Sequence, residues 1–392
     1  MTYDYDVVVV GGRVAGAATA MLMARRGHRV LVVERAAMPS DTVSTHAILR
    51  TGVLQLTRWG LIDRIASAGT PPVRQIMLGF GDDRIAFDVR HDFGIRELYG
   101  PRRHVLDGIL IEAAREAGAE LRDGTAMKDL LWDGSGRVNG VRVEREGSTE
   151  AITARHVVGA DGYRSRVADL AGSAMRRSHP ATNAIHYSYF EGIDFPGFWF
   201  QFTPGVNTGL IPTNEGRCLV FAGRPTELRA RFTSDPDAEF GRLLEQGGLD
   251  LAERVAAGAR VERFYGTSGL SGFIRQAWGP GWVLVGDAGY TKDPISAHGI
   301  SDALRDAELC ARALDRAVLD PSDESEALDW YETLRDSLSE TLFQQSEELA
   351  RFEWSPEEAS ARMRVISDEV RAECETMLSL PAWELATSLV RS

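Results

Sequence analysis

Short apolar runs alternate with segments of helical periodicity at the start of the chain. Tyr5 to Val10 is a β-branched apolar run that glycines end at once, as in a buried parallel strand. Val14 to Arg26 follows with helical spacing, and Arg29 to Val33 is a second apolar run that ends at Glu34. This order predicts the strand, turn, helix and strand unit of an α/β domain.

Elements of both kinds continue up to residue 160. The pattern predicts a mostly helical segment over 38–68, a half-buried hairpin over 76–89, a helix over 102–118, a strand over 119–122, a meander over 128–146 and a buried strand over 155–160.

Aromatic strands dominate the middle of the chain. Candidate strands lie at 185–190, 198–202, 209–212 and 218–222, and a helix over 237–257 interrupts them. After residue 281 the chain returns to the α/β character of its start and then becomes helical to its end. Two stretches rich in antiparallel strands are therefore inserted into one parallel α/β domain.

Charge and cysteine usage exclude several classes of function. The formal net charge of −13 argues against a nucleic-acid-binding or anionic-membrane-binding surface. Cys218, Cys310 and Cys374 form no disulfide framework and no metal-ligand pattern, so we expect no metal site. No apolar run is long enough to cross a bilayer and the chain starts directly with a strand, so we expect a cytoplasmic protein without stable membrane association.

The first turn resembles a phosphate-binding loop. Gly11-Gly12-Arg13-Val14-Ala15-Gly16 matches G-x-G-x-x-G except at the middle glycine, where Arg13 stands. The free N–H groups and positive end of the following helix suit a pyrophosphate. Glu34 stands where an acid accepts hydrogen bonds from ribose hydroxyls. Two orientations of Arg13 are open, because its guanidinium either turns outward or meets a phosphate.

Two later stretches join this turn. Val158 to Ser165 contains Asp161-Gly162 at a strand end, and Val283 to Tyr290 contains Gly286-Asp287 in the same setting. Plain turn chemistry explains each Asp-Gly or Gly-Asp pair alone. The order and separation of all three stretches predict one site for flavin adenine dinucleotide (FAD), held non-covalently.

This layout resembles the FAD-dependent aromatic hydroxylases, the single-component group A flavoprotein monooxygenases, over about residues 5 to 340. The resemblance rests on the glycine turn with Glu34 and Arg35, on Arg103 at a helix start, on Asp161-Gly162, and on Gly286-Asp287 followed by Pro294 and Gly299. It implies that Arg103 reaches the cofactor, that Asp161 lies near the pyrophosphate, that Asp287 binds the ribityl chain, and that the loop from Pro294 to Gly299 lies against the isoalloxazine ring.

The same resemblance defines the expected fold class and domains. We expect an α/β protein with a Rossmann-like FAD-binding domain, an interleaved antiparallel-sheet substrate domain and a C-terminal helical region. The expected divisions are an FAD-binding domain over 1–70, 98–175 and 276–340, a substrate domain over 71–97 and 176–275, and C-terminal helices over 341–392. The substrate pocket then lies between the two sheets.

The chemistry implied is monooxygenation. NAD(P)H is expected to dock transiently, because no second dinucleotide fold follows residue 170, and O2 and a small molecule are the other reactants. A flavin C4a-hydroperoxide then hydroxylates or epoxidises the substrate. Gly299, Ile300 and Ser301 begin a helix whose N–H groups and dipole suit the negative charge of a reduced flavin.

Several residues depart from the aromatic hydroxylases. Ser296-Ala297-His298-Gly299 replaces the usual glycines and glutamine, Ser301 replaces asparagine, and Ser40 to His46 follows the second strand. With Arg13, these features look like a subgroup common in actinobacterial secondary metabolism. A polyketide, terpenoid or indole-type natural product, as in antibiotic biosynthesis, is therefore a better substrate class than a simple phenol.

Candidate reactive and pocket residues are histidines and aromatics. His46 and His298 are candidates to move a proton near the isoalloxazine ring, and an N-cap or packing role is the alternative for His46. The candidate pocket residues are Met77, His186, Tyr187, Tyr189, Phe200 and Phe202, and the alternative is that this aromatic strand face is simply core.

Three other activities are weighed against monooxygenation. Tryptophan halogenases show W-x-W-x-I-P, which Phe198-Trp199-Phe200-Gln201 lacks. Geranylgeranyl-type reductases share the Gly286-Asp287-Ala288 pattern followed by a glycine loop and a helix, so FAD-dependent alkene reduction is the alternative function. A non-redox cyclase that uses FAD as a scaffold is a third possibility.

Overall fold

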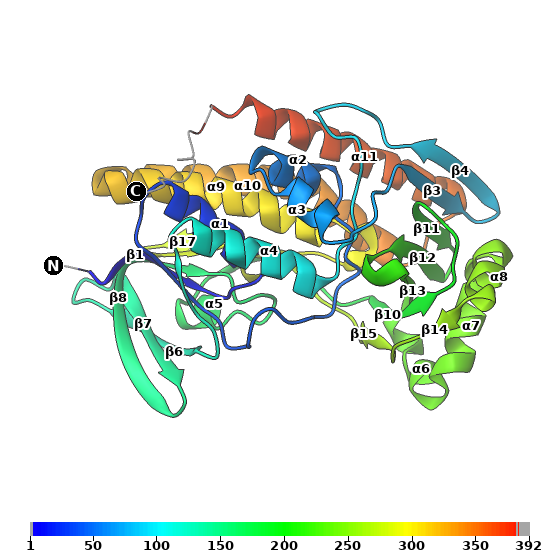
Figure 1. The fold of residues 1–392 in the computed structure, drawn as a ribbon, viewed down its shortest axis with the longest axis horizontal. Helices are drawn as coiled ribbons and strands as arrows, with labels where there is room; N and C mark the ends of the chain where they lie inside the picture. The colour runs from blue at the N-terminus through cyan, green and yellow to red at the C-terminus, as the bar shows by residue number, and fades with distance from the viewer. Residues whose placement is uncertain (1–2, 382, 384–392) are drawn as a thin grey trace.

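A mostly parallel sheet forms one half of the molecule (Figure 1). The computed structural model describes residues 3–381 and 383. The strand order is β17-β18-β8-β1-β2-β5, with β6 and β7 extending from β8. The bounds are β1 (Tyr5–Val10), β2 (Val30–Val33), β5 (Glu120–Arg122), β6 (Ala126–Trp132), β7 (Val138–Arg145), β8 (Ser148–Gly159), β17 (Trp278–Gly279) and β18 (Trp282–Leu284).

Strand β1 lies at the centre of this sheet and is covered on both faces. Val7 and Val9 pack into the main core with the helices, while Val8 and Val10 pack into a second cluster under the β6–β7–β8 meander. Its neighbours β2 and β8 both run parallel to it. Burial on both faces explains why the sequence shows a continuous valine run rather than alternation.

Strand β8 belongs to two pairings in succession. Its first half pairs antiparallel with β7 up to Thr153, and its second half pairs parallel with β1 from Ala154. The strand therefore continues from the meander into the centre of the sheet and ends at Gly159, beside the end of β1 at Val10.

The second sheet collects strands from two distant parts of the chain. Its order is β14-β10-β13-β12-β11-β3-β4, and β15 pairs with β10. β3 pairs parallel with β11, which joins the early hairpin to the later aromatic strands. The bounds are β3 (Gln75–Phe80), β4 (Asp83–Asp88), β10 (Asn183–Glu191), β11 (Phe198–Thr203), β12 (Val206–Pro212), β13 (Cys218–Pro225), β14 (Ala259–Arg260) and β15 (Tyr265–Thr267).

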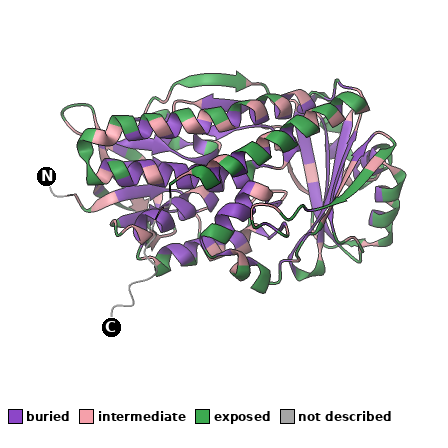
Figure 2. Cartoon of the chain, turned by 90° about the horizontal axis from the view of Figure 1, so that it is seen from above, coloured by how far each residue is buried: buried purple, intermediate pink, exposed green. Residues whose placement is uncertain are grey.

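Helices cover both sheets, and Figure 2 shows the strands of the second sheet mostly buried, with exposed turns on the outer helices. The bounds are α1 (Val14–Arg25), α2 (Arg50–Arg58), α3 (Ile62–Ser67), α4 (Arg103–Glu116), α5 (Arg166–Leu170), α6 (Ala230–Ser234), α7 (Pro236–Gly247), α8 (Leu249–Ala257), α9 (Gly299–Leu319), α10 (Glu324–Ala350) and α11 (Pro356–Ser379). A small sheet of β9 (Met175–His179), β16 (Gly272–Arg275) and β19 (Tyr290–Thr291) links the two halves.

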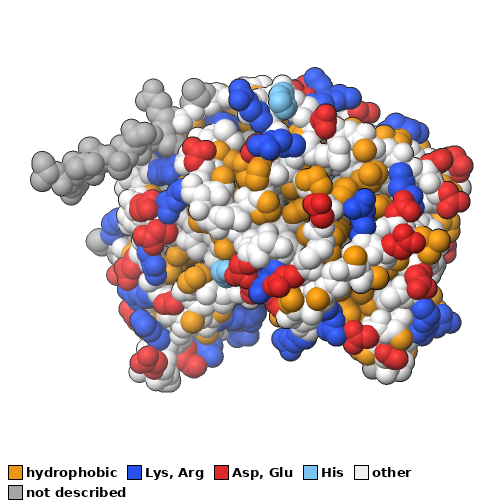
Figure 3. Space-filling view, turned by 45° about the vertical axis from the view of Figure 1, so that its right-hand side comes forward, with side chains coloured by type: hydrophobic (Ala, Val, Ile, Leu, Met, Phe, Trp, Pro, Cys, Tyr) orange, Lys and Arg blue, Asp and Glu red, His pale blue; other side chains and the backbone are white. Residues whose placement is uncertain are grey.

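The expected α/β class, with a parallel sheet, an interleaved antiparallel sheet and C-terminal helices, is confirmed. The division set at residue 341 falls inside the continuous helix α10, and residues 382 and 384–392 of that region lie outside the described residues. None of the described helices has the length and apolar character that a membrane span requires. Acidic and basic side chains are interspersed on the face shown in Figure 3.

Two predicted helices differ in the structure. The segment over 38–68 is helical only from Arg50, because Ser40 and Asp41 bind arginines of other elements and hold the preceding chain irregular. The helix over 237–257 is broken between α7 and α8 at Gly248, whose φ of 153° no helix accommodates.

Close packing around the first turn generates a prediction. A Cβ at Gly16 would lie 1.9 Å from the Gly11 carbonyl oxygen, so Gly16→Ala should destabilise the fold by about 2 kcal/mol or more. Urea unfolding measures the loss. Gly134→Ala is the matched control, because nothing lies within 4 Å of a Cβ there. Equal midpoints for the two variants would contradict the close contact.

Candidate FAD-binding site

The glycine turn brings three backbone segments into contact. Gly11 has φ of 107°, and a Cβ there would lie 2.3 Å from the carbonyl oxygen of Ala160, just beyond β8. Gly16, on the first turn of α1, faces the Gly11 carbonyl as closely. Side chains at either position would push the start of α1 away from the strand ends. Because both residues are glycines, the free N–H groups of the helix stay close to the sheet.

Glu34 is fixed beside this turn at the end of β2. Its side chain is buried, and its carboxylate accepts hydrogen bonds from the Gly12 N–H at 2.7 Å and the Ala36 N–H at 2.9 Å. A carboxylate offers about four acceptor positions, so lone pairs remain for ribose hydroxyls. The neighbouring Arg35 is exposed.

Two other segments hold the Arg13 side chain in the structure. Its guanidinium donates to Asp107 Oδ2 at 2.8 Å and to the Ser40 carbonyl at 3.0 Å, so it turns toward α4. Arg103 donates to the other oxygen of Asp107 at 3.1 Å. Asp107 is fully buried, and burial raises the pKa of its carboxyl although both arginines lower it. One buried carboxylate thus holds two cations near the start of α1.

Asp287 stands at a turn beyond β18. Gly286 has φ of 60°, and a Cβ there would meet the Cβ of Ala15 on α1 at 2.9 Å. Asp287 remains exposed although it follows a fully buried strand, while the protein around it removes part of its hydration. This desolvation raises the pKa of Asp287 to about 6, against the lowering effect of Lys292 and Arg103. An accessible carboxylate in a recessed position suits hydroxyl donors of a ribityl chain.

The loop from Pro294 leads directly into α9. A short 3-10 turn, η4 (Pro294–Ser296), is followed by Ala297 with φ of 57°, and Gly299 then opens the helix in an exposed position. The Asp302 N–H makes the first hydrogen bond of the helix, to the His298 carbonyl. The N–H groups before it, including those of Gly299 and Ile300, have no intrahelical acceptor and are available to an anion.

Ser301 and Ile300 have structural side chains. Ser301 Oγ accepts a hydrogen bond from the Leu49 N–H at 3.1 Å, which ties α9 to the start of α2. Ile300 is buried in the main core. Only their backbone groups therefore face outward from the helix start.

Asp161 holds the start of α5, whose N-cap residue is Ser165. Its carboxylate accepts hydrogen bonds from the Ser165 hydroxyl, from the Arg166 N–H at 2.7 Å and from the Val167 N–H at 3.1 Å, at the start of α5. These bonds are the turn chemistry that explains an Asp-Gly pair alone, and the expected place of Asp161 near the pyrophosphate stays a prediction.

His298 is buried and neutral at physiological pH. Burial, with the positive charge of Lys292, lowers the pKa of His298 to about 4. Nδ1 lies against the Ser296 carbonyl, which only accepts, so Nδ1 carries the proton and Nε2 is left as an acceptor. This tautomer suits a base.

His46 forms a buried pair with Tyr189. Its Nε2 is hydrogen-bonded to the Tyr189 hydroxyl, and its Nδ1 is buried without a hydrogen-bond partner. Burial, with the charge of Arg103, lowers the pKa of His46 to about 3. Tyr187 lies alongside and accepts a hydrogen bond from the Ser44 N–H at 3.1 Å. The segment after β2 thus contacts the second sheet directly.

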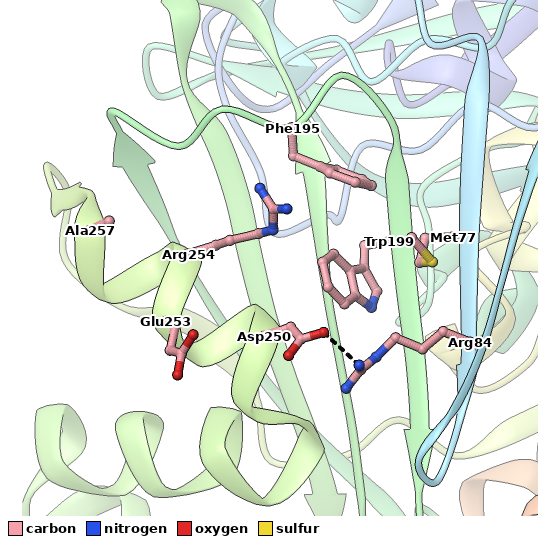
Figure 4. A pocket seen from close by; sticks show the side chains of 8 residues that line it. All are labelled: Met77, Arg84, Phe195, Trp199, Asp250, Glu253, Arg254 and Ala257. Atoms are coloured by element: carbon pink, nitrogen blue, oxygen red, sulfur yellow. Dashed lines mark hydrogen bonds and ion pairs between the residues drawn. The ribbon is translucent and has the colours of Figure 1, made fainter.

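The six candidate pocket residues do not share one face of that sheet. Tyr187, Tyr189, Phe200 and Phe202 belong to the main core on the cofactor side. Met77 packs against the opposite cluster, and it lines an open pocket of about 440 Å³ with Trp199 and Arg84 (Figure 4). His186 stacks on Phe232 of that opposite cluster, with ring centroids 3.6 Å apart. At most four of the six face the cofactor half.

Arg102 is a site residue that sequence reasoning missed. Its guanidinium bonds Asp41 at 2.6 Å and Glu262 at 2.7 Å and lies 3.9 Å from the centre of the Tyr189 ring. It joins the segment after β2 to the second sheet. Arg102 and Arg103 are adjacent in the sequence, but Arg102 has no motif position, and its partners Asp41 and Glu262 come from distant segments. Asp107, which binds Arg13 and Arg103, has no motif position either.

The glycine turn, Glu34, Asp287 and the start of α9 lie along the carboxyl ends of parallel strands, the usual place for a dinucleotide in such sheets. The fold and site together define an FAD-dependent oxidoreductase. The chain belongs to the FAD binding domain family, whose profile matches residues 4–346. NAD(P)H is the reductant typical of this family.

Named relatives share about three quarters of their length with the chain. Digeranylgeranylglycerophospholipid reductase 2 of Methanopyrus kandleri is 29% identical over 323 residues, which cover 79% of this chain and 75% of the relative. Menaquinone reductase of Mycolicibacterium smegmatis is 29% identical over 334 residues, with 79% and 76% covered.

Solved structures of low identity share the fold. The flavin-dependent brominase Bmp2 superposes with a TM-score of 0.81 at 17% identity, over 97% of this chain and 96% of that one. PqsL, described as a probable FAD-dependent monooxygenase from Pseudomonas aeruginosa, superposes with a TM-score of 0.74 at 22% identity, over 89% and 98%.

The position of Glu34 generates a prediction. Glu34→Ala should weaken FAD binding by about 1–3 kcal/mol, because a charged acceptor for the adenosine ribose is lost, and should leave the binding of FMN, which lacks adenosine, nearly unchanged. Fluorescence titration with both ligands measures this. Glu245→Ala, an exposed acid on α7, is the control. An equal loss for FAD and FMN would show that Glu34 is not at the ribose.

Proposed function

We propose that the chain is an NAD(P)H- and O2-dependent monooxygenase that hydroxylates or epoxidises a planar aromatic or polyketide-like small molecule. The observation that carries this proposal is the chemistry of the second sheet where it meets the cofactor half. Tyr187, Tyr189 and Tyr265 gather there with His46 and Arg102. Phenols, an imidazole and a guanidinium suit a flat ligand with polar substituents.

The same cluster of side chains argues against a long isoprenoid substrate. An isoprenoid chain suits an apolar site, and here hydroxyl, imidazole and guanidinium groups stand among the rings. Tyr187 and Tyr265 stack with centroids 5.5 Å apart, and Arg263 lies 5.1 Å from the Tyr265 ring centre. A planar aromatic ligand matches these rings in shape and in the charge of its edges.

Each part of the site has a role in this reaction. FAD, when bound, supplies hydride acceptance and oxygen activation. Glu34 and Asp287 hold the two ends of the cofactor through hydroxyl groups. The helix start at Gly299 stabilises negative charge, and His298, which is neutral before the reaction, offers Nε2 as a proton acceptor.

Alkene reduction is the second candidate, and the sequence relatives favour it. Two reductases are 29% identical to the chain over more than three quarters of its length. Both activities require a reduced flavin, so the helix start at α9 serves either one. They differ in whether oxygen or only hydrogen enters the product.

Labelled oxygen gas separates these activities. Polycyclic phenols and prenylated alkenes are first screened for faster NAD(P)H oxidation, and the best substrate is then turned over under labelled O2. Mass spectrometry should find one labelled oxygen atom in the product. An unlabelled product with two extra hydrogens would establish the reductase instead, and an unlabelled product of unchanged composition would establish a cyclase.

His298 generates a separate prediction. His298→Ala should raise hydrogen peroxide release per NAD(P)H oxidised by about tenfold, because a base near the reaction is lost, while FAD affinity changes much less. Peroxide assay and flavin titration measure the two effects. His186→Ala is the control, since His186 lies on the far face of the second sheet. Unchanged peroxide release would show that His298 takes no part in the reaction.

A further inference from the structure

Two neighbouring residues of α10 hold the loop that precedes α9. Glu347 Oε1 accepts a hydrogen bond from the Asp293 N–H at 3.0 Å. Ser346 Oγ donates to Ser296 Oγ at 2.8 Å. All four residues are buried. The loop is therefore fixed on both sides of Pro294 by one helix that lies behind it.

Asp293 also connects the loop to the substrate sheet. Its Oδ1 accepts hydrogen bonds from the Asn183 side-chain amide at 2.9 Å and from the Ile295 N–H at 2.9 Å. Asn183 begins β10, the strand that carries Tyr187 and Tyr189. A single buried carboxyl thus joins the expected flavin-facing loop, the substrate sheet and, through its own N–H, helix α10.

The charges around this junction come from several elements. His179 of β9 places Nδ1 2.8 Å from Glu347 Oε2, and Arg351 donates to the other ring nitrogen of His179 at 3.1 Å. Lys292, paired with Asp302 on α9, also acts on Glu347. Burial raises the pKa of Asp293 to about 7 and that of Glu347 to about 8, and the nearby Asp293 carboxyl adds to the latter.

We propose that Glu347 is a positioning residue for the bound flavin: it fixes the Asp293 end of the loop, and the protonation of the Asp293–Glu347 pair sets the charge behind that loop. When the pair holds a proton, one of the two carboxyls is neutral. When the proton leaves, two negative charges lie in a low-dielectric region beside the helix start that receives negative charge on flavin reduction. Reduction then becomes less favourable.

The inference requires bound FAD but not oxygen insertion. It holds equally for a monooxygenase and for a reductase, so a failure of the labelled-oxygen experiment leaves it intact. Conversely, its own failure does not decide between these activities.

The test compares Glu347→Gln and Glu347→Ala in the FAD-loaded protein. Glutamine keeps the oxygen that accepts from Asp293 but does not titrate, whereas alanine removes both properties. Glu340→Gln, an exposed acid on the same helix, is the matched control. The measurements are the flavin midpoint potential from about pH 6 to about pH 9, the FAD dissociation constant and thermal stability.

We expect Glu347→Gln to keep FAD affinity within about twofold and Glu347→Ala to weaken it about tenfold, the value of one buried hydrogen bond. The midpoint potential of the wild-type protein should fall more steeply with pH than that of Glu347→Gln. Because the pKa of Glu347 is raised in the folded protein, its protonation stabilises the folded state fully at pH values below its pKa in the unfolded chain. That contribution is lost as pH rises through about 8, its pKa in the folded protein. The wild-type protein should therefore lose thermal stability relative to Glu347→Gln over that range.

Two results would overturn the proposal. One is an identical pH dependence of the potential in the wild-type protein and Glu347→Gln. The other is a Glu347→Ala protein of lower thermal stability whose flavin potential and affinity are unchanged, because that shows a purely structural tie. If Glu347→Ala fails to fold, Glu347→Gln alone decides.

Discussion

The contact between the Gly11–Gly16 turn and the end of β8 is the constraint on which the rest of the site depends. Backbone atoms of the turn approach the Ala160 carbonyl so closely that any side chain at Gly11 would overlap it. Because of that contact, the start of α1, the ends of β1 and β8 and the turn beyond β18 share one edge of the sheet. Glu34, Asp287 and the start of α9 then lie along the same edge, which is why residues so far apart in sequence make one candidate site.

Much of the fold was predictable from the sequence because its pattern is local. The valine run of β1, the helical spacing of α1 and the alternation in β3 each depend on neighbours a few residues away. The irregular segment before Arg50 was not predictable, since Ser40 and Asp41 are bound by Arg13 and Arg102, which directly precede α1 and α4. Its apolar spacing alone indicated a helix, and tertiary contacts prevent one.

The candidate site shows the same contrast between features that a local pattern predicts and features that depend on distant contacts. Motif positions marked Gly11, Gly16, Glu34 and Asp287 as candidates, because each motif encodes a backbone requirement or a strand end. Contacts between distant residues could not be predicted, because nothing in the order of residues indicates that Arg13 binds Asp107 or that Asp293 binds Glu347. The pocket residues were harder still, since alternate strand positions face opposite clusters and the face of a strand depends on its partners.

The carboxylate shared by Arg13 and Arg103 has a kinetic consequence. The two guanidinium groups that share Asp107 place positive charge near the start of α1, in a chain whose net charge is −13. An anionic ligand approaching the molecule is repelled at long range and attracted only near this point. Added salt screens the long-range repulsion first, so the rate of cofactor binding should rise at moderate ionic strength. The opposite is found when the net charge of a protein attracts its ligand, because salt then slows binding.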